Sequence, residues 1–342
     1  MREPGLFDLQ MRMDQLHEFG NPLEQLAQCV DWDDFRAQLE TIRDKERKSA
    51  AGRKPYDVVL MFKILILQSL YNLSDAQTEF QIKDRLSFMD FLGLSLGDRV
   101  PDEKTVWLFR EQLTQAELID TLFAQFQEVL NEAGFVARKG QIIDASIVPA
   151  PKQRNSKEEN QQIKDGQTPA AWDETPAKKR QKDTDARWTK KRGTSHYGYK
   201  NHVSVDVKHK FVRRFAVTDA ATHDSQALDD VLDETNTNGD VYADSAYRSD
   251  QTSEWLTDNG YRDRIHEKAY RNKPLTNRQK AANRTKSRTR ARVEHVFGVQ
   301  SQMAGQVIVR TIGLARAKVK IGLRNLAYNI NRYTVLVGSV SG

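Results

Sequence analysis

From residue 140 onward, the sequence alternates short apolar stretches, typical of strands, with amphipathic stretches, typical of helices. Residues 140–148 (GQIIDASIV) predict a first strand. The stretches HYGYKNHVSVDV and FVRRFAVTDA predict two more strands, joined by a turn at KHK. Helix, strand, helix, strand and two further helices follow, over residues 223–236, 240–247, 249–260, 261–267, 276–303 and 312–337. This order predicts an α/β domain with a mixed sheet.

The first 140 residues predict helices only. Residues 55–74 (PYDVVLMFKILILQSLYNLS) are apolar almost all round, which is typical of a helix buried in a core. Their most apolar run contains Lys63 and is much shorter than the ~20 apolar residues of a membrane span. A second helix is predicted over residues 74–94, capped by Ser74 or Asp75 and ending near Gly93.

Two more helices are predicted before residue 140. One begins at Pro101 with acidic residues in its first turn. The other follows a capping box formed by Thr114 and Glu117 and ends at Gly134. The connection SLGDRVP between short helices leaves two interpretations open. Either the region forms a helix-turn-helix-like unit or, because it is acidic, it is a plain helical bundle.

A long segment separates the first two predicted strands. Residues 151–195 are rich in charged residues, Gln, Pro and Thr, and they contain few apolar residues besides Trp172 and Trp188. Such a composition cannot bury much apolar surface. We therefore expect a weakly ordered insertion.

Charge is distributed unevenly along the chain. Residues 1–140 hold 17 Lys and Arg against 24 Asp and Glu, a net charge of −7. Residues 141–342 hold 36 against 23, a net charge of +13. The basic part is the candidate for contact with a nucleic acid, in preference to a merely solvated basic surface.

The single cysteine and the N-terminal residues bear on the cellular compartment. Cys29 has no partner cysteine, so an intrachain disulfide is excluded, which fits a reducing cytoplasm. The first twenty residues lack an apolar core followed by a small-residue cleavage site, so no signal peptide is expected.

Three acidic residues stand apart from the general pattern. Asp144 lies within a predicted strand, Asp244 ends another, and Glu294 is the only acid from residue 268 to the end, among 16 Lys and Arg. Because Val293 and Val296 flank Glu294, we expect its side chain to face the sheet. Clustered carboxylates suit hard divalent cations such as Mg²⁺, and a pair of such ions can cleave a phosphodiester.

Other metal and nucleotide motifs are missing from the sequence. No Cys and His spacing typical of zinc occurs, and there is no phosphate-binding or dinucleotide-binding glycine motif. Each acid also has a structural interpretation. Asp144 can pair with a lysine at a strand end, Asp244 can cap the following turn, and Glu294 can pair with Arg290 one helical turn earlier.

Several further stretches carry weaker predictions. In HDS, residues 223–225, the side chains either support a metal site or cap the next helix, and capping is favoured. Lys200 and His202, in SHYGYKNH, either contact DNA or belong to a structural strand edge. Arg248 follows Asp244 and is a candidate phosphate ligand. The basic tract at 271–292 is expected to follow a DNA backbone with salt-sensitive affinity, and the last helix to pack one face and expose another to DNA.

Taken together, these stretches resemble the DDE transposases of the bacterial insertion-sequence-five group. The resemblance covers most of the chain and is carried by GRKPYDVVLMFKILILQSLYNLSD, VPDEKTVWLFREQL, IIDASIV, HYGYKNHVSVD, THDSQAL, YADSAYRS and RARVEHVFG. The catalytic acids of that family map onto Asp144, Asp244 and Glu294. Its helix signature of tyrosine, arginine, glutamate and lysine is matched at Arg290 and Glu294, whereas Ser287 and Ser301 stand at the tyrosine and lysine positions. Arg288, Arg292 or Lys286 is then expected to supply the phosphate contact.

The resemblance implies a ribonuclease H-like catalytic domain at 138–342, preceded by a helical region at 1–137 that recognises DNA ends or mediates dimerisation. It implies two Mg²⁺ ions, replaceable by Mn²⁺, with Asp144 bridging them and Asp244 and Glu294 each completing one site. The expected partners are the terminal inverted repeats, target DNA and a second copy of the chain, in a bacterial cytoplasm at the nucleoid. The DNA contacts are assigned to Arg248, Lys286, Arg288, Arg290, Arg292 and Lys200.

Two other classes stay open at this point. One is a metal-dependent nuclease of the same fold that cuts DNA without joining strands. The other is a non-catalytic DNA-binding protein descended from such an enzyme, against which the retention of all three acids argues.

Overall fold

The computed structural model describes residues 5, 7–43, 54–191, 193–271, 273–305 and 308–338. The chain divides into two compact units. Unit 1 comprises residues 1–130 and 326–342, and unit 2 comprises residues 131–325. Each is described by itself. The helix α14 (Leu314–Gly338) contributes its first half to unit 2 and its second half to unit 1.

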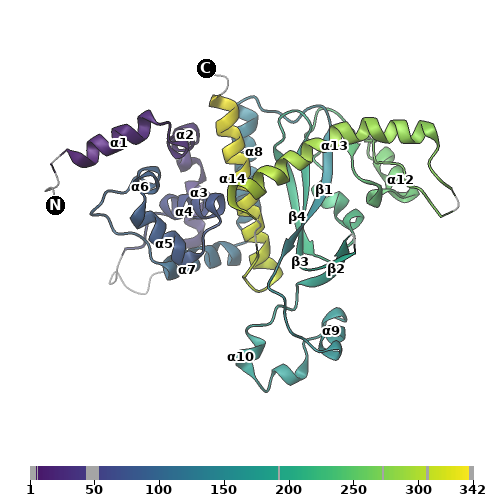
Figure 1. The fold of residues 1–342 in the computed structure, drawn as a ribbon, viewed down its shortest axis with the longest axis horizontal. Helices are drawn as coiled ribbons and strands as arrows, with labels where there is room; N and C mark the ends of the chain where they lie inside the picture. The colour runs from purple at the N-terminus through teal and green to yellow at the C-terminus, as the bar shows by residue number, and fades with distance from the viewer. Residues whose placement is uncertain are drawn as a thin grey trace. The chain divides into compact units, whose positions relative to one another are not determined.

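Unit 1 is built from helices, as predicted (Figure 1). Ten of the fourteen residues of α4 are buried, and Asp57 caps it by accepting hydrogen bonds from two backbone amides. Aromatic rings of Trp32, Phe35 and Phe91 pack around Phe62 and one another near this helix. The helices are α1 (Asp8–Glu18), α2 (Pro22–Cys29), α3 (Arg36–Glu40), α4 (Val58–Tyr71), α5 (Asp75–Asp84), α6 (Leu86–Leu92), α7 (Glu103–Gln115) and α8 (Ile119–Glu132), with short 3₁₀ turns η1 (Trp32–Phe35) and η2 (Thr41–Arg43).

Two predicted boundaries in this region are wrong. The single helix predicted over 74–94 is broken at Arg85, whose extended backbone separates α5 from α6. Ser74 does cap α5, in a capping box with Gln77. The predicted capping box at Thr114 does not form, because α7 continues through Gln115 and the Thr114 hydroxyl donates to the Arg110 carbonyl.

One buried ion pair ties three helices of unit 1 together. Arg110 on α7 donates two hydrogen bonds of 2.7 Å to the carboxylate of Asp75 on α5. It also donates to the side-chain oxygen of Gln68 on α4, at 2.9 Å. Because Arg110 is buried, the bidentate geometry and the third bond are needed to offset its lost hydration.

Unit 2 contains a six-stranded mixed sheet in the order β2-β3-β1-β5-β6, with β4 also paired to β3. The central strand β1 pairs antiparallel with β3 and parallel with β5, which in turn pairs parallel with β6. This is the mixed, helix-flanked sheet that the sequence predicted. The strands are β1 (Gln141–Pro149), β2 (Arg187–Lys191), β3 (Thr194–Asp206), β4 (Val212–Asp219), β5 (Asp240–Tyr242) and β6 (Arg262–Asp263).

The two faces of this sheet pack against different helices. Ile143 and Ala243 pack on one face with apolar residues of α11 (Leu228–Val231) and α12 (Asp250–Asp258). On the other face, Val148 and Tyr199 pack with residues of α14. The long helix α13 (Asn277–Ala304) contacts β1 and β5 (Figure 1). Alternation along β1 places residues 142, 144, 146 and 148 on the face of α14.

The segment at 151–195 differs from the weakly ordered insertion that we expected. It contains α9 (Lys157–Lys164), a 3₁₀ turn η3 (Ala170–Trp172), α10 (Pro176–Lys179) and strand β2. Trp172 is fully buried, and its indole N–H donates to Glu159 at 2.6 Å. Composition missed this order because a single tryptophan organises the segment. Strand β2 has few apolar residues, since it pairs only with β3.

Other elements of unit 2 are shorter than predicted. The helix predicted at 223–236 is a 3₁₀ turn, η4 (Asp224–Ala227), followed by the single turn α11. The strand predicted at 240–247 ends at Tyr242, and a 3₁₀ turn η5 (Ser245–Tyr247) follows. Among the described residues, no single helix is long and apolar enough to cross a bilayer. Only α4 and α5 taken together reach that size, and they meet at an angle of 100°.

Candidate active site

Asp144 and Asp244 lie at matching positions on neighbouring parallel strands. Ile142 on β1 is in register with Tyr242 on β5, and each aspartate comes two residues later. Because side chains alternate along a strand, both carboxylates project from the same face as these residues. The Asp144 carboxylate accepts the Ala145 amide at 2.8 Å, and Asp244 caps η5 by accepting the Ala246 amide at 2.7 Å. The capping role predicted for Asp244 is thus confirmed, and it does not move the residue away from Asp144.

Arg290 of α13 contacts the first of these carboxylates. Its guanidinium Nη2 lies 3.1 Å from Oδ2 of Asp144, and both side chains are more than four-fifths buried. Burial raises the pKa of Asp144, the positive charge of Arg290 lowers it, and the negative charge of Asp244 raises it. The ion pair therefore offsets only part of the cost of burying this carboxylate beside a second one.

Glu294 lies one helical turn after Arg290, but its side chain is exposed. Our expectation that it faces the sheet is wrong. Val293 and Val296 are buried and already fill the inward stripe of α13, so Glu294 is turned ~100° away from Val293. It shares the side of the helix that carries Arg290. The described residues contain no hydrogen bond or ion pair of Glu294, so the predicted pairing with Arg290 is not formed.

The donor atoms around Asp144 suit a hard divalent cation in part. Two carboxylates lie side by side, and the charge of Asp244 raises the cost of the charge on Asp144, which a bound cation would relieve. The third acid does not join them, since among the described residues no group of three Asp, Glu, His or Cys side chains is close enough to hold a metal ion. Asp144 and Asp244 thus fit part of a metal site, and this arrangement leaves Glu294 outside it.

His266 and Ser287 belong to the same region and were not predicted. The His266 amide donates to the Ala243 carbonyl at 3.1 Å, which places His266 beside Asp244. Its ring Nε2 lies 3.3 Å from the hydroxyl of Ser287 on α13. Burial lowers the pKa of His266, and the positive charges of Arg290 and Lys286 lower it further. The sequence offered one signal: Ser287 stands where the resembled family has a tyrosine.

Most of the basic residues predicted to contact DNA are bonded within unit 2. Arg248 pairs with Asp263 and Glu267. Lys286 donates to the Ile265 carbonyl at 2.7 Å, and Arg292 donates to the Val207 carbonyl. Lys200 donates to the Thr222 carbonyl at 2.6 Å and pairs with Asp224 at 2.8 Å.

Arg288 differs from those four residues. Its side chain is exposed and makes no hydrogen bond or ion pair with another described residue, as is also true of the side chains of Arg278, Lys280 and Arg284. Lys280, Arg284 and Arg288 follow one another at intervals of four residues, so they form a row along one side of α13. On α13, Lys286 and Arg290 therefore face the rest of unit 2, whereas Lys280, Arg284 and Arg288 form an outward row that meets solvent.

The residues around HDS and His202 serve the structure. The His223 side chain, rather than Asp224 or Ser225, caps η4 by accepting the Ser225 amide. His202 is fully buried on β3, with Nε2 2.8 Å from the hydroxyl of Thr218. A DNA contact by His202 is therefore excluded in this conformation.

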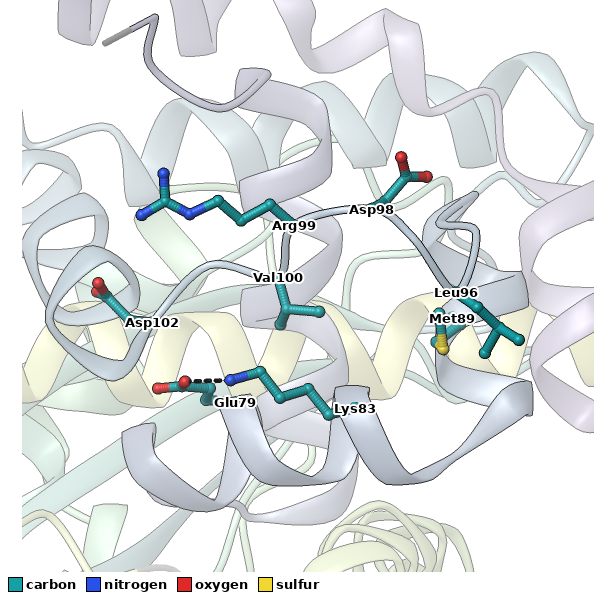
Figure 2. Close-up of a pocket in the computed structure, with 8 residues that line it drawn as sticks. All are labelled: Glu79, Lys83, Met89, Leu96, Asp98, Arg99, Val100 and Asp102. Atoms are coloured by element: carbon teal, nitrogen blue, oxygen red, sulfur yellow. Dashed lines mark hydrogen bonds and ion pairs between the residues drawn. The ribbon is translucent and has the colours of Figure 1, made fainter.

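Unit 1 has an open cavity of about 480 Å³ between α5 and the connection to α7 (Figure 2). Glu79 and Lys83 form an ion pair of 2.5 Å on one wall, and the connecting loop supplies the other side. No predicted site residue lines it. The full lining is Glu79, Lys83, Met89, Leu96, Asp98, Arg99, Val100 and Asp102.

Comparison with known families decides the class of protein. A family model described as a transposase DDE domain matches residues 137–330, which is more than half of the chain. The chain belongs to this transposase family. A second model, described as a transposase domain (DUF772), matches residues 11–112. Together the two models identify a DDE transposase of the insertion-sequence-four and insertion-sequence-five group. The transposase acts on DNA, and enzymes of its family generally use divalent metal ions.

A solved structure is also similar to this transposase, at a greater distance. It is titled as the cryo-EM structure of the piggyBac transposase synaptic complex with hairpin DNA. The sequence identity is 11%, the TM-score is 0.45, and the match covers 94% of this chain and 76% of that one. So low a similarity adds nothing to the assignment made by the family models.

Proposed function

We propose that this transposase cuts phosphodiester bonds at the ends of its own DNA element and joins the freed 3′-hydroxyl to target DNA. The observation that carries the proposal is the register of β1 and β5. It places Asp144 and Asp244 side by side on one face, with a raised pKa for Asp144. Paired carboxylates of this kind are suited to hold Mg²⁺ or Mn²⁺, and we assign Glu294 as the third acid.

The divalent ions, when bound, would supply an activated water and stabilise charge on the departing oxygen. The residues of the chain have separate tasks. Asp144 and Asp244 would hold the ions through their carboxylates. Arg290 orients and partly neutralises Asp144, on the side of α13 that also carries Glu294. The outward row at Lys280, Arg284 and Arg288 would follow the backbone of the DNA being cut.

The helical unit 1 would recognise the element ends or bring two copies of the chain together. A pair of copies is proposed because two element ends must be held at once. Several exposed apolar side chains of unit 1 support either task, among them Phe80 and Trp107 on helices and Leu96 in the connection between α6 and α7.

The test replaces Asp144 with asparagine, which removes the charge and keeps the shape. Purified Asp144→Asn is incubated in Mg²⁺ with a plasmid that carries the transposase gene and its native flanking DNA. We expect strand cleavage to be lost and DNA affinity to be retained. Asp240→Asn is the matched control, because Asp240 is a carboxylate of β5 that pairs with Arg262 and Arg264 instead.

Two outcomes would count against the proposal. If Asp144→Asn still cuts DNA at the rate of the wild type, the catalytic assignment is wrong. If the wild type yields cut products but no joined products, the chain is a nuclease without strand transfer.

A further inference from the structure

Residues 262–267 bond to β5 and the residue after it on one side and to α13 on the other, and we call them the bridging segment. On one side, the segment extends the parallel pairing with β5. The Arg264 amide donates to the Val241 carbonyl at 2.9 Å, and the His266 amide donates to the Ala243 carbonyl at 3.1 Å. The segment therefore follows the chain up to the residue before Asp244.

On its other side, the bridging segment is bonded to α13. The Glu267 amide donates to the side-chain oxygen of Asn283 at 2.9 Å, and the Asn283 side-chain nitrogen donates back to the Glu267 carbonyl at 3.0 Å. Lys286 donates to the Ile265 carbonyl at 2.7 Å. Two successive turns of α13 are thus fastened to the same short segment, just before the turn that carries Arg290.

The carboxylate of Glu267 lies between two cations from these two elements. Oε1 is 3.1 Å from Nη2 of Arg248 and 3.8 Å from Nζ of Lys286. Arg248 comes four residues after Asp244, and its other nitrogen pairs with Asp263. Lys286 comes four residues, about one helical turn, before Arg290. One carboxylate therefore joins the chain just after Asp244 to the helix that carries Arg290 and Glu294.

These charged groups are shielded enough for the pairing to matter. The side chains of Arg248, Asp263, Glu267 and Lys286 are between 17% and 26% exposed. At such positions, ion pairs are screened less than on an open surface, and removing one partner leaves a poorly hydrated charge. The three hydrogen bonds of the segment to α13 need no charge on Glu267, so the segment should stay in place when that charge is removed.

We propose that Glu267 is a positioning residue, which sets α13 against Asp244 by holding Arg248 and Lys286 together. The inference rests on the proposed function, because it assigns Arg290 and Glu294 a task beside Asp144 and Asp244. It also gives Arg248 and Lys286 a role other than DNA contact. Their cations are held by Glu267 and the backbone, so neither is free for a phosphate.

The test is Glu267→Gln in the full chain, which removes the charge and retains the size of the side chain. We expect kcat for strand cleavage in Mg²⁺ to fall about 10- to 100-fold, because a displacement of ~1 Å in a catalytic group has an effect of this size. KM and the affinity for a mixed-sequence duplex should stay within about twofold. The melting temperature should change little, since the backbone bonds of the segment remain.

Arg262→Gln is the matched control. Arg262 belongs to the same bridging segment and pairs with Asp240 of β5, without any described bond to α13. It should cleave at the rate of the wild type. The double variant Arg248→Met with Glu267→Gln supplies a second measurement. If the pair acts as one unit, its loss of kcat will be smaller than the product of the two single losses.

The outcomes separate this inference from the proposed function. An unchanged kcat in Glu267→Gln, with an active wild type, overturns the positioning role and leaves the transposase chemistry intact. A rise in DNA affinity in Glu267→Gln also overturns it, because the released cations would then be binding phosphate. A wild type without any cleavage would instead count against the proposed function.

Discussion

Among its described residues, unit 1 holds a largely buried bidentate ion pair, Arg110 with Asp75, between helices that pack mainly through apolar side chains. In unit 2, the charged side chains are arranged differently. Its charged side chains form connected sets on both faces of the sheet, from Lys200 with Asp224 on one side to Arg290 with Asp144 on the other. The acidic unit is therefore stabilised mainly by its apolar core. The basic unit combines apolar clusters with buried and half-buried charged groups, whose contribution to stability depends on bound ligands and on pH.

This contrast shows what net charge does and does not reveal. The excess of basic residues after residue 140 correctly singles out the unit that carries the transposase DDE domain. It does not show which cations are free to bind. Arg248, Lys286 and Lys200 are held by bonds within the protein, whereas the side chains of Arg284 and Arg288 are exposed and make no hydrogen bond or ion pair with another described residue.

The largest expected effect concerns the apolar core of unit 1. Phe62→Ala removes a fully buried ring that packs against Phe35 and Trp32, and it should lower the free energy of unfolding by about 3–5 kcal/mol. Urea unfolding followed by tryptophan fluorescence measures the loss. Phe80→Ala is the control, because Phe80 is 62% exposed and its removal leaves no cavity. A loss of unfolding free energy below about 1 kcal/mol in Phe62→Ala would contradict the conclusion that apolar packing stabilises unit 1.

A smaller effect is expected from the buried histidine of unit 2. Burial lowers the pKa of His202 to about 4, and Lys200 lowers it too, while the negative charges of Asp224 and Asp219 act in the opposite direction. An unfolded histidine has a pKa near ~6.5, so only the unfolded state gains a proton between these values. The contribution of His202 to stability is complete above pH ~6.5 and is lost as the pH falls toward 4.

The measurement compares urea unfolding of the wild type and of His202→Gln at pH 7.5 and pH 5. Between these values the wild type should lose roughly 2 kcal/mol more than the variant, which has no imidazole to protonate. Equal losses in both proteins would show that His202 does not contribute to the pH dependence. Unit 1 offers no comparable group, since its one histidine, His17, is 40% exposed.

The smallest effect concerns a single exposed cation. Arg288→Ala should weaken binding of a mixed-sequence duplex roughly four- to eightfold near 0.1–0.2 M salt. It should also make the negative slope of log K against log salt about 0.9 shallower, the value for one phosphate contact. Lys83→Ala, a 54% exposed cation of unit 1, is the control and should leave the slope unchanged. If Lys83→Ala makes the slope shallower by as much, the acidic unit also binds the DNA backbone. Unit 2 would then not be the only unit that carries the DNA contacts.

Local sequence patterns predicted which helices and strands are present in this transposase better than they predicted where those helices and strands begin and end. The apolar helix at 58–71 and the strand at 141–149 were both predicted, because each carries an unbroken pattern over many residues. The break at Arg85 was missed, since nothing nearby in the sequence forbids a helix there. Strand β2 and the buried Trp172 were missed because their order comes from pairing with β3 and from a bond to Glu159, which the polar composition of the segment does not reveal.

For the candidate site, the sequence by itself determined the residue types: one aspartate within a strand, one at the end of another strand, and one glutamate in a basic helix. Only the tertiary structure decided how they meet. The parallel register of β1 and β5 brings Asp144 beside Asp244, although they are one hundred residues apart. The rotation of α13, set by the burial of Val293 and Val296, turns Arg290 toward Asp144 and leaves Glu294 exposed. Register and helix rotation depend on packing summed over whole elements, which no short stretch of sequence contains.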